Sequence, residues 1–400
     1  MLIIFQFFAT NQTNTTEDER EYVHKIISLI SNKTTTTSLK RIISTQKKIK
    51  RILFWGTFYD VTPDLKDYCI TDEKSMDFCD RKCEYTVNEQ DLNQSDAVVF
   101  HGRDTVTNFP THLPHQRWVF LMFESPDNSW TNISEWNNIF DWTMSYRRDS
   151  DVFIPYGELM PISGQSERIV LSANISSRKL VAWAVSNCDM VSSERKALVD
   201  ELSKFIPIDV YGTCGVHHCP GNSRVQCNDP QRCYEYLGHR YKFYLSFENS
   251  ICQDYITEKF FLALSNGMVP VVHGPSKNTY QNLAPRNSFI HIADFSSLKD
   301  LADYLLHLNQ NDEAYMKYFS WREDFVVDKT YYFHRAWCSL CIKLYEEITP
   351  IITPTEIIKQ KQNHIYASIH NWWFYTNGSS TKKKLCRRVT VKNGTFKYYE

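Results

Sequence analysis

Residues 241–274 read "YKFYLSFENSICQDYITEKFFLALSNGMVPVVHG", and their pattern predicts one βαβ unit. The first apolar run is typical of a buried strand. The helical pattern that begins near Asp254 ends at Gly267, a residue type that stops helices. The last apolar run is a second strand. A strand, a helix and a strand in this order indicate a parallel sheet with a helical crossover.

The same pattern continues upstream of this unit. The amphipathic segment "SSERKALVDELSKFIP" predicts a helix capped by Ser192 or Ser193. An earlier series of short apolar runs starts at "RILFWGTFYD" (51–60), and each run ends in polar residues. Such runs suit buried parallel strands with helical crossovers. We therefore expect an α/β protein with an N-terminal domain at 49–175 and a C-terminal domain at 176–345.

The two ends of the chain lack this pattern. The apolar start "MLIIFQFFAT" (1–10) is shorter than the about 20 residues that cross a bilayer, and we interpret it as the remnant of a truncated signal-anchor. Residues 11–48 are rich in Thr, Ser and Asn, which is typical of a stem. Residues 346–400 form an extension without an assigned role, and its aromatic "NWWFYTNG" is more typical of packing than of a sugar platform.

Sequons and cysteines indicate the compartment. Eight Asn-x-Ser/Thr sequons and twelve cysteines together favour the secretory pathway. The sequons are at Asn11, Asn14, Asn32, Asn93, Asn132, Asn174, Asn377 and Asn393. The formal net charge of -1 gives no reason to expect nucleic acid as a partner.

Two groups of cysteines allow other interpretations. "CGVHHCPGNSRVQCNDPQRC" (214–233) holds four cysteines and two histidines, so a zinc site is an alternative, but it lacks paired Cys-x-x-Cys spacing. "WCSLC" (337–341) has redox spacing, but no thioredoxin-like strand precedes it. We expect structural disulfides in both groups.

Polar residues stand where predicted strands end. Glu248 and Asn249 follow one strand, and Glu124 follows another in "RWVFLMFESP". Ligands of open α/β sheets bind at the carboxyl ends of the strands, so these side chains are candidate site residues. Glu124 precedes Ser125-Pro126, which favours an extended geometry suited to a general base; the alternative is a turn acid.

A phosphate site is the second expectation at this edge. The helix that begins near Asp254 offers free N–H groups to a phosphate, Lys259 adds a positive charge, and Glu258 suits ribose hydroxyls. Neighbouring Glu and Lys on a helix more often face solvent, which is the alternative. Arg195 begins the other helix as a second cation, or as an exposed helix residue. The chain has no G-x-G-x-x-G or P-loop motif.

Five segments resemble one known family. "YKFYLSFENSICQDYITEKFF", "VPVVHGPSKNTY", "SFIHIADF", "RWVFLMFESP" and "WTMSYRRDSDVFIPYG" are similar to the α1,3/4-fucosyltransferases of glycosyltransferase family ten, from about 51 to 345. The resemblance implies a GT-B fold, with two Rossmann-like domains facing a cleft. It also implies that the N-terminal domain binds the acceptor and the C-terminal domain binds GDP-fucose. The family consists of Golgi type II membrane enzymes with a lumenal catalytic domain.

The resemblance also assigns roles to residues. Glu124 matches the family's proposed catalytic base. The donor-binding positions match Arg195, Lys242, Asn249, Tyr255, Glu258 and Lys259. Of these, Arg195 and Lys259 match positions for the diphosphate and Glu258 for the ribose. It further implies that Cys338 and Cys341 pair with two of three upstream cysteines, Cys69, Cys79 and Cys83.

The implied reaction is the inverting transfer of L-fucose from GDP-β-L-fucose to a GlcNAc hydroxyl of a glycoprotein N-glycan. The acceptor GlcNAc is in the core or an antenna, and the Cys-rich insertion at 214–233 resembles the invertebrate and plant branch that modifies the core. We expect no required cofactor, with stimulation by Mn²⁺ allowed.

Two alternatives remain open at this point. Asp149 and Asp151 of "RRDSD" form an Asp-x-Asp, which holds Mn²⁺ in metal-dependent glycosyltransferases. The other alternative is a secreted, catalytically inactive glycan-binding module.

Overall fold

The computed structural model describes most of the chain from residue 49 onward. The described residues are 49–61, 63–65, 70, 76–104, 108–129, 133–162, 175–188, 192–220, 229–328, 332–347, 365–375 and 383–399. Ile49 apart, they belong to one compact unit, Lys50–Glu400. The predicted signal-anchor remnant and stem lie outside this description, as do Cys69, Asn132, Asn174 and Asn377.

The first half of the unit holds a parallel sheet of six strands in the order β2-β1-β3-β4-β5-β6. Its strands are β1 (Lys50–Trp55), β2 (Cys83–Thr86), β3 (Ala97–His101), β4 (Arg117–Met122), β5 (Trp142–Ser145) and β6 (Val152–Phe153). Strand β3 is buried along its whole length, as a central strand with both faces covered should be. The predicted buried parallel strands are therefore confirmed.

The connections in this half differ from the expectation of helical crossovers. Between β1 and β6 the described residues form 3-10 turns and loops and no α-helix; the turns are η3 (Glu89–Gln94), η4 (Pro126–Asn128) and η5 (Ile133–Glu135). Prolines explain part of the difference. Pro110 and Pro114 interrupt the β3–β4 connection, and Pro126 opens the 3-10 turn η4 in the connection after β4.

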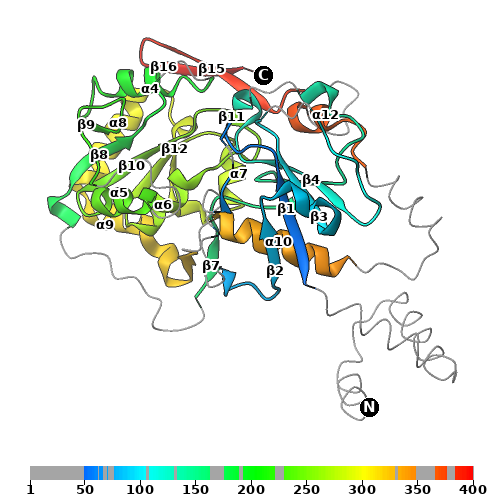
Figure 1. Ribbon diagram of the computed structural model, residues 1–400. Coiled ribbons are helices and arrows are strands. Elements are labelled where there is room, and N and C mark those ends of the chain that lie inside the picture. The colour runs from blue at the N-terminus through cyan, green and yellow to red at the C-terminus, as the bar shows by residue number, and fades with distance from the viewer. Residues whose placement is uncertain are drawn as a thin grey trace, which may run out of the picture. The chain divides into compact units, whose positions relative to one another are not determined.

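Helix α10 (Tyr332–Glu346) covers one face of this first sheet, although it comes from far along the chain (Figure 1). Trp337 is fully buried, and its ring packs edge-on against Phe54 of β1 with centroids 4.5 Å apart. Ala336 and Leu340 are buried in the same cluster. A segment that the sequence placed in the C-terminal half thus supplies the missing helical layer of the N-terminal half.

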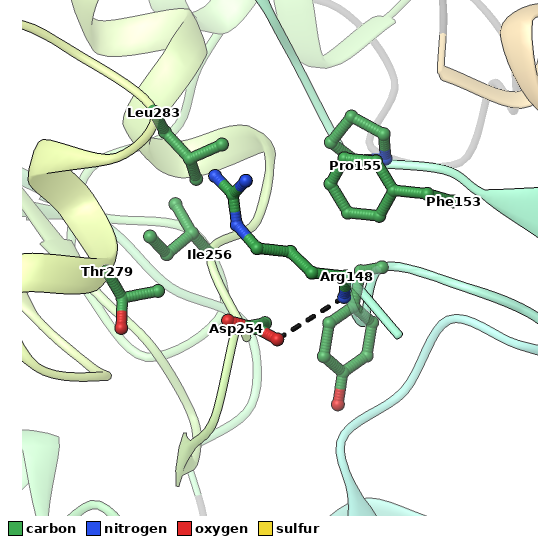
Figure 2. A pocket seen from close by; sticks show the side chains of 8 residues that line it. Arg148, Phe153, Pro155, Asp254, Ile256, Thr279 and Leu283 are labelled. Atoms are coloured by element: carbon green, nitrogen blue, oxygen red, sulfur yellow. Dashed lines mark hydrogen bonds between the residues drawn. The ribbon is translucent and has the colours of Figure 1, made fainter. Parts of the chain in front are cut away.

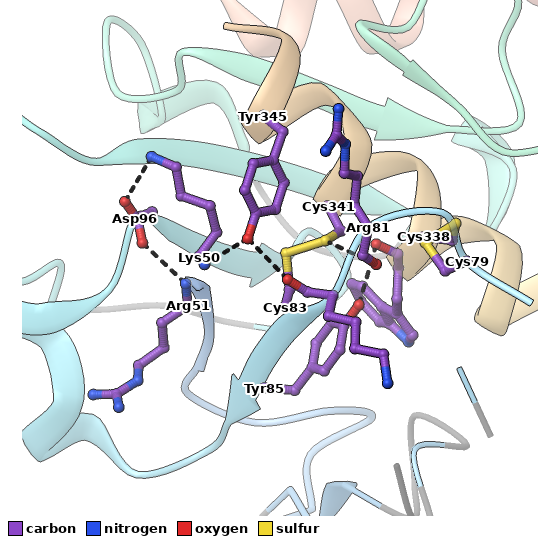
Figure 3. Close-up of a disulfide and its surroundings, with 12 residues drawn as sticks. Lys50, Arg51, Cys79, Arg81, Cys83, Tyr85, Asp96, Cys338, Cys341 and Tyr345 are labelled. Carbon is purple, nitrogen blue, oxygen red and sulfur yellow. Dashed lines mark hydrogen bonds and ion pairs between the residues drawn. A yellow bond between two sulfur atoms is a disulfide. The ribbon is translucent and has the colours of Figure 1, made fainter. Parts of the chain in front are cut away.

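Two disulfides fix this helix to the sheet (Figure 3). Cys79 is bonded to Cys338, and Cys83 at the start of β2 is bonded to Cys341. The Tyr345 hydroxyl, one turn further on, donates at 3.0 Å to the carbonyl of Lys82, the residue before β2. The two cysteines of "WCSLC" therefore pair with upstream cysteines and not with each other.

The second half holds a parallel sheet of five strands in the order β13-β12-β10-β8-β9. Its strands are β8 (Lys179–Ala184), β9 (Ile208–Tyr211), β10 (Tyr241–Phe247), β12 (Val269–His273) and β13 (Ile290–His291). Helices cover both faces, because alternate residues of β10 join different clusters: Phe243 packs with α4 and α8, and Tyr244 packs with α5 and α6. The covering helices are α4 (Arg195–Leu202), α5 (Asp229–Gly238), α6 (Glu258–Ser265) and α8 (Leu298–Gln310).

The predicted βαβ unit is confirmed as β10, α6 and β12. Gly267 follows α6 with a φ of 73°, the left-handed conformation in which glycine ends a helix. The smaller described elements are η7 (Ile175–Ser177), α7 (Lys277–Gln281), η8 (Arg286–Ser288), η9 (Ile292–Asp294), α9 (Asp312–Met316), η10 (Lys317–Glu323), and the antiparallel pair β7 (Leu159–Pro161) and β14 (Phe325–Val327).

The C-terminal extension has two described parts. Helix α12 (Ile369–Phe374) belongs to "NWWFYTNG", and it packs Trp372 and Trp373 into the core of the first half. Trp373 is fully buried and its indole N–H donates to the Ser129 hydroxyl at 3.0 Å, so packing is the role of these aromatics. The second part, β15 (Cys386–Lys392) and β16 (Thr395–Tyr399), is a hairpin that pairs with β11 (Ile251–Cys252).

The remaining disulfides bear on the alternative of a zinc site at 214–233. Cys188 is bonded to Cys214, Cys219 to Cys233 and Cys252 to Cys386. Three of the four cysteines of the 214–233 segment are therefore oxidised, and a disulfide sulfur is not a zinc ligand. Cys227 lies outside the described residues.

Two surface features complete the description. Asn93 and Asn393, the two sequon asparagines in the described ranges, are both exposed. None of the described helices is long and apolar enough to cross a membrane.

The two bridges of α10 predict a non-additive effect on stability. Cys79 and Cys83 are four residues apart, and Cys338 and Cys341 are three residues apart. Each bridge therefore closes nearly the same loop, of 259 or 258 residues in sequence separation. Removing one bridge by paired Cys→Ser substitution should cost about 2–3 kcal/mol, and removing both should cost about 5 kcal/mol more. Urea unfolding of the single-bridge and double-bridge variants measures this. The Cys219–Cys233 bridge, which closes a separation of 14 residues, is the control. Equal steps for the first and second bridge would contradict the expectation.

Candidate active site

A direct hydrogen bond joins the carboxyl ends of the two sheets. The Ser125 hydroxyl follows β4 and Glu124, and it donates to the Ser250 hydroxyl at 2.7 Å. Ser250 follows β10 and Asn249. Both serines are buried, at 0% and 2% exposure. The candidate base and the candidate donor-binding residues of the other half are therefore held next to each other.

Glu124 is surrounded by donors from three other segments. Its carboxylate accepts from the Tyr59 hydroxyl at 3.5 Å and from the Asn128 amide at 3.3 Å. Arg103 lies 3.8 Å from it, and the same guanidinium is 4.9 Å from the centre of the Tyr59 ring. The Glu124 side chain remains 21% exposed, so an acceptor can reach a carboxylate that its neighbours orient.

The sequence analysis missed Tyr59 and Arg103. A signal for Arg103 was present, because "VVFHGRD" places it directly after β3, the neighbour of β4 in the sheet. The rule that ligands bind at strand ends applies to it as well as to Glu124. Tyr59 lies in an irregular loop after β1 and has no such signal.

The helix end that we expected to bind phosphate is occupied by a carboxylate of the protein. Helix α6 begins at Glu258 and not near Asp254, because Asp254 has a left-handed φ of 59° and Thr257 is extended. Glu248 accepts the backbone N–H of Thr257 at 2.8 Å and its hydroxyl at 3.0 and 2.9 Å. Burial raises the pKa of Glu248, and the nearby Lys259 charge opposes this shift.

Lys259 shares its charge with two acids. Its ammonium donates to the Thr257 hydroxyl at 2.8 Å and to Glu258 at 3.1 Å, and it lies 3.5 Å from Glu248. Burial alone would lower the pKa of Lys259, but Glu258 and Glu248 raise it above the usual lysine value. The positive charge of the Lys259 ammonium is therefore largely neutralised by the two neighbouring carboxylates.

The start of α4 offers a better site for an anion. Arg195 is the first helical residue, and Glu194 before it has a left-handed φ of 51° and makes no side-chain cap. Ser192 and Ser193 were the expected caps, and this expectation is wrong. Their buried hydroxyls have no hydrogen-bond partner among the described residues. Donors left open at a helix N-terminus suit an anion.

Arg195 reinforces this conclusion. The side chain is 4% exposed and donates to the carbonyls of Phe247 and Asn187, both at 3.2 Å. Burial lowers the pKa of Arg195, and no carboxylate in the described part of the chain lies within ion-pair distance of it. The Ser193 N–H donates to the Asn249 carbonyl at 3.3 Å, which joins this helix end to the loop after β10.

The seam between the halves also contains a pocket. Tyr255 is buried with its ring 5.0 Å from Tyr146 of the first half. Beside it, the Arg148 backbone N–H donates to Asp254 at 3.3 Å, and the Arg148 guanidinium donates to the Asn282 carbonyl at 3.2 Å. Figure 2 shows this arginine extended between residues of both halves, which line the pocket: Tyr146, Phe153, Pro155, Asp254, Ile256, Thr279 and Leu283.

Lys242 does not lie with the other candidate residues. It stands at the start of β10, five residues before its end, which corresponds to roughly 17 Å along the strand. Its buried ammonium donates to the Asn309 carbonyl at 2.9 Å and to Asp312 at 3.0 Å. Lys242 therefore connects the sheet to the end of α8 and lies apart from the other candidate residues.

Asp149 and Asp151 are both engaged by protein groups. Asp149 accepts from the Arg147 guanidinium at 2.9 Å. Asp151 accepts from the Thr143 N–H at 2.8 Å and from the Tyr366 hydroxyl at 2.8 Å. Their partners hold the two carboxylates in separate networks, which does not favour the alternative of a shared metal site at this motif.

Comparisons with known proteins agree with this geometry. Residues 47–157 match the family model "Fucosyltransferase, N-terminal", and residues 175–372 match "Glycosyltransferase family 10 (fucosyltransferase) C-term". The chain is 41% identical over 273 residues to human 4-galactosyl-N-acetylglucosaminide 3-alpha-L-fucosyltransferase FUT6, which covers 66% of this chain and 72% of that protein. It is 44% identical over 264 residues to human alpha-(1,3)-fucosyltransferase 4, which covers 64% of this chain and 47% of that protein.

A solved structure shows the same fold. A crystal structure of an alpha1,3-fucosyltransferase with GDP aligns with a TM-score of 0.50, over 76% of this chain and 92% of that one, at 16% identity. The predicted GT-B class, with two Rossmann-like halves facing each other, is confirmed.

His273 predicts how stability depends on pH. This residue ends β12, and its Nε2–H donates to the Ser193 carbonyl at 2.8 Å. Burial lowers the pKa of His273 to about 3. An unfolded histidine titrates near 6.5, so between these values the unfolded state binds the extra proton and stability falls as the pH falls. The loss should be about 1.4 kcal/mol per pH unit below 6.5.

Urea unfolding at pH 7 and pH 5 tests this expectation. His273→Gln should lose much of the pH dependence, because Gln does not titrate. The variant of the exposed His239, His239→Gln, should keep the dependence of the wild type. An unchanged slope in His273→Gln would contradict the assignment.

Proposed function

The chain belongs to the fucosyltransferases of glycosyltransferase family 10, and we propose that it moves L-fucose from GDP-β-L-fucose to a GlcNAc hydroxyl of a glycoprotein N-glycan. The observation that carries the proposal is the Ser125–Ser250 hydrogen bond of 2.7 Å, which sets Glu124 of one half beside Asn249 of the other. The name of the human FUT6 relative specifies 3-α-L-fucosyl transfer to a 4-galactosyl-N-acetylglucosaminide, which supports this acceptor class. The acceptor GlcNAc belongs to the core or to an antenna of the glycan.

The reaction we propose is a single displacement with inversion. Glu124 takes the proton of the acceptor hydroxyl while the hydroxyl oxygen attacks the anomeric carbon of fucose. The bond from that carbon to the β-phosphate oxygen breaks, and GDP leaves with the electron pair. A β-linked donor thus gives an α-linked product. Tyr59, Asn128 and Arg103 support the role of Glu124, because together they orient one partly exposed carboxylate.

Donor binding follows from the second half. We assign the diphosphate to Arg195 and Lys259, and the ribose to Glu258. Asn249 and Tyr255 lie around the sugar nucleotide. The buried, unpartnered Asn249 Oδ1 and Arg195 Nε support this assignment, since each lacks a hydrogen bond within the described residues. These cations and the α4 N-terminus stabilise the charge that develops on the departing diphosphate.

We further propose that the protein acts in the lumen of the Golgi cisternae, held at the membrane by an N-terminal anchor as a single-pass type II protein. The described residues contain five disulfides, which form in oxidising compartments and support a lumenal location. The exposed sequons at Asn93 and Asn393 support a glycosylated surface.

Glu124→Gln should abolish most transfer. Gln keeps the size of the side chain and one acceptor oxygen but does not take up a proton, so kcat should fall by about 10²–10⁴-fold while the KM for GDP-fucose changes little. The measurement is fucose transfer from GDP-fucose to two acceptors, a complex antenna and a core N-glycan.

The matched control is Glu135→Gln, at an exposed acid of the same half. NMR of the product linkage tests inversion. Transfer by Glu124→Gln at the wild-type rate would show that the base lies elsewhere. No transfer by the wild type to either acceptor would overturn the proposed function.

The reaction should not require a metal ion. We expect the EDTA-treated enzyme to keep most of its rate and Mn²⁺ to add only a modest stimulation, because Asp149 and Asp151 are held by Arg147 and Thr143. Initial rates with EDTA and then with excess Mn²⁺ measure this. Complete loss with EDTA and full recovery with Mn²⁺ would favour the Asp pair instead.

A further inference from the structure

The C-terminal hairpin lies beyond the residues that the family models match, which end at 372. Its strands β15 and β16 join through Asn393 and Gly394, with φ of 51° and 71°, the two left-handed positions of a tight hairpin turn. In Figure 1 the hairpin, coloured red, runs along one side of the unit, near β11 and α4. The family models therefore say nothing of the hairpin, and its role has to be inferred from its contacts with the rest of this chain.

The hairpin is attached at both ends of its length. At its base, Cys386 pairs with Cys252 of β11 in the ladder and is bonded to it by a disulfide. At its tip, the Gly394 carbonyl accepts the Leu298 N–H of α8 at 2.9 Å. β11 begins two residues after Asn249, so the hairpin crosses from the donor loop to the helix layer of the second half.

One face of β15 points toward the protein. Val389 is buried and Val391 packs against the core of the second half, and Arg387 shares their face because side chains alternate along a strand. Arg388 and Lys392 are on the opposite, exposed face. The charge of Arg387 is therefore turned inward.

A chain of contacts leads from Arg387 to the start of α4. Its guanidinium lies 5.1 Å from the centre of the Tyr398 ring. The Tyr398 hydroxyl donates to Nδ1 of His273 at 3.2 Å, and Nε2–H of His273 donates to the Ser193 carbonyl at 2.8 Å. Tyr398 and His273 thus connect Arg387 to the loop of Ser192 and Ser193, whose hydroxyls have no partner in the described ranges.

Arg387 and Arg195 act on the same histidine. Burial is the largest cause of the low pKa of His273, and the positive charges of Arg387 and Arg195 lower it further. Burial and Arg387 also lower the pKa of His291. The charges of both guanidinium groups therefore act on one buried imidazole.

The carboxylates whose charges act on Arg195, those of Glu248 and Glu258, form no ion pair with it in the described part of the chain. Within the described residues, neither Arg387 nor Arg195 has a carboxylate within 4.0 Å, whereas Arg388 on the outer face lies 4.0 Å from Asp127. Nearby, the buried side-chain oxygens of Ser192, Ser193 and Asn249 have no hydrogen-bond partner among these residues. Two unmatched guanidinium groups with open hydroxyls suit a ligand with several anionic oxygens.

We propose that Arg387 binds the diphosphate of the donor together with Arg195, so that the C-terminal hairpin completes the donor site. The proposal rests on the proposed function, because it takes a nucleoside diphosphate as the ligand. Tyr398 acts as a positioning residue, since its ring supports the guanidinium and its hydroxyl is fixed by His273.

Binding of GDP and of guanosine to the full disulfide-bonded chain tests the proposal. Arg387→Ala should weaken GDP binding by roughly 10- to 100-fold, the usual effect of a lost charge-assisted hydrogen bond, and should change guanosine binding by less than about twofold. Arg388→Ala is the matched control, as its neighbour on the outer face, and should leave both affinities unchanged. Isothermal titration for GDP and competition NMR for guanosine give the constants.

A second variant keeps the test decisive. Arg387→Gln retains the length of the side chain without its charge, and it should show the same selective loss of GDP affinity. Wild-type GDP affinity in both variants would overturn the role of Arg387 and leave the proposed function intact. Equal losses for GDP and guanosine would also overturn it, because they would show an effect through packing. A wild type that does not bind GDP would overturn the proposed function together with this inference.

Discussion

The hydrogen bond between Ser125 and Ser250 is the constraint on which the site depends. Each serine directly follows a candidate functional residue, Glu124 or Asn249, at the end of a central parallel strand. Ser125 is extended before Pro126, with φ of -72° and ψ of 159°, so its direction is set by its own backbone. Because the two hydroxyls are bonded to each other in a buried seam, replacing either serine would leave the other buried hydroxyl without this partner.

The N-termini of α4 and α6 lie at the same edge of the second sheet but differ in the charges around them. Glu248 occupies the start of α6 and balances Lys259, so that end is already satisfied. At the start of α4, Glu194 makes no side-chain cap, and the printed hydrogen bonds of Arg195 within the described residues go to two backbone carbonyls. A buried guanidinium with no ion pair among the described residues is unfavourable, which is the kind of cost that proteins retain at sites where a ligand supplies the missing charge.

The sequence predicted what depends on local pattern. Continuous apolar runs gave the parallel strands, and Gly267 gave the end of α6. It did not predict contacts that are made by segments far away in the sequence. Nothing local shows that α10 covers the first sheet, or that Lys242 is taken by Asp312 seventy residues later. The cap of α4 is a different failure: Ser193 is a good cap by type, but its hydroxyl is left open at the site, as expected where function overrides local preference.

The hairpin and the donor loop depend on each other. A two-stranded hairpin alone is marginally stable, and β11 is only two residues long, so neither would be well ordered by itself. The Cys252–Cys386 disulfide and the ladder between β11 and β15 join them into one three-stranded sheet. That sheet begins right after Asn249 and ends at the start of α8. The loop that carries the donor-binding residues is thus held from outside the Rossmann-like half by residues at the end of the chain, and the same connection places Arg387 beside it.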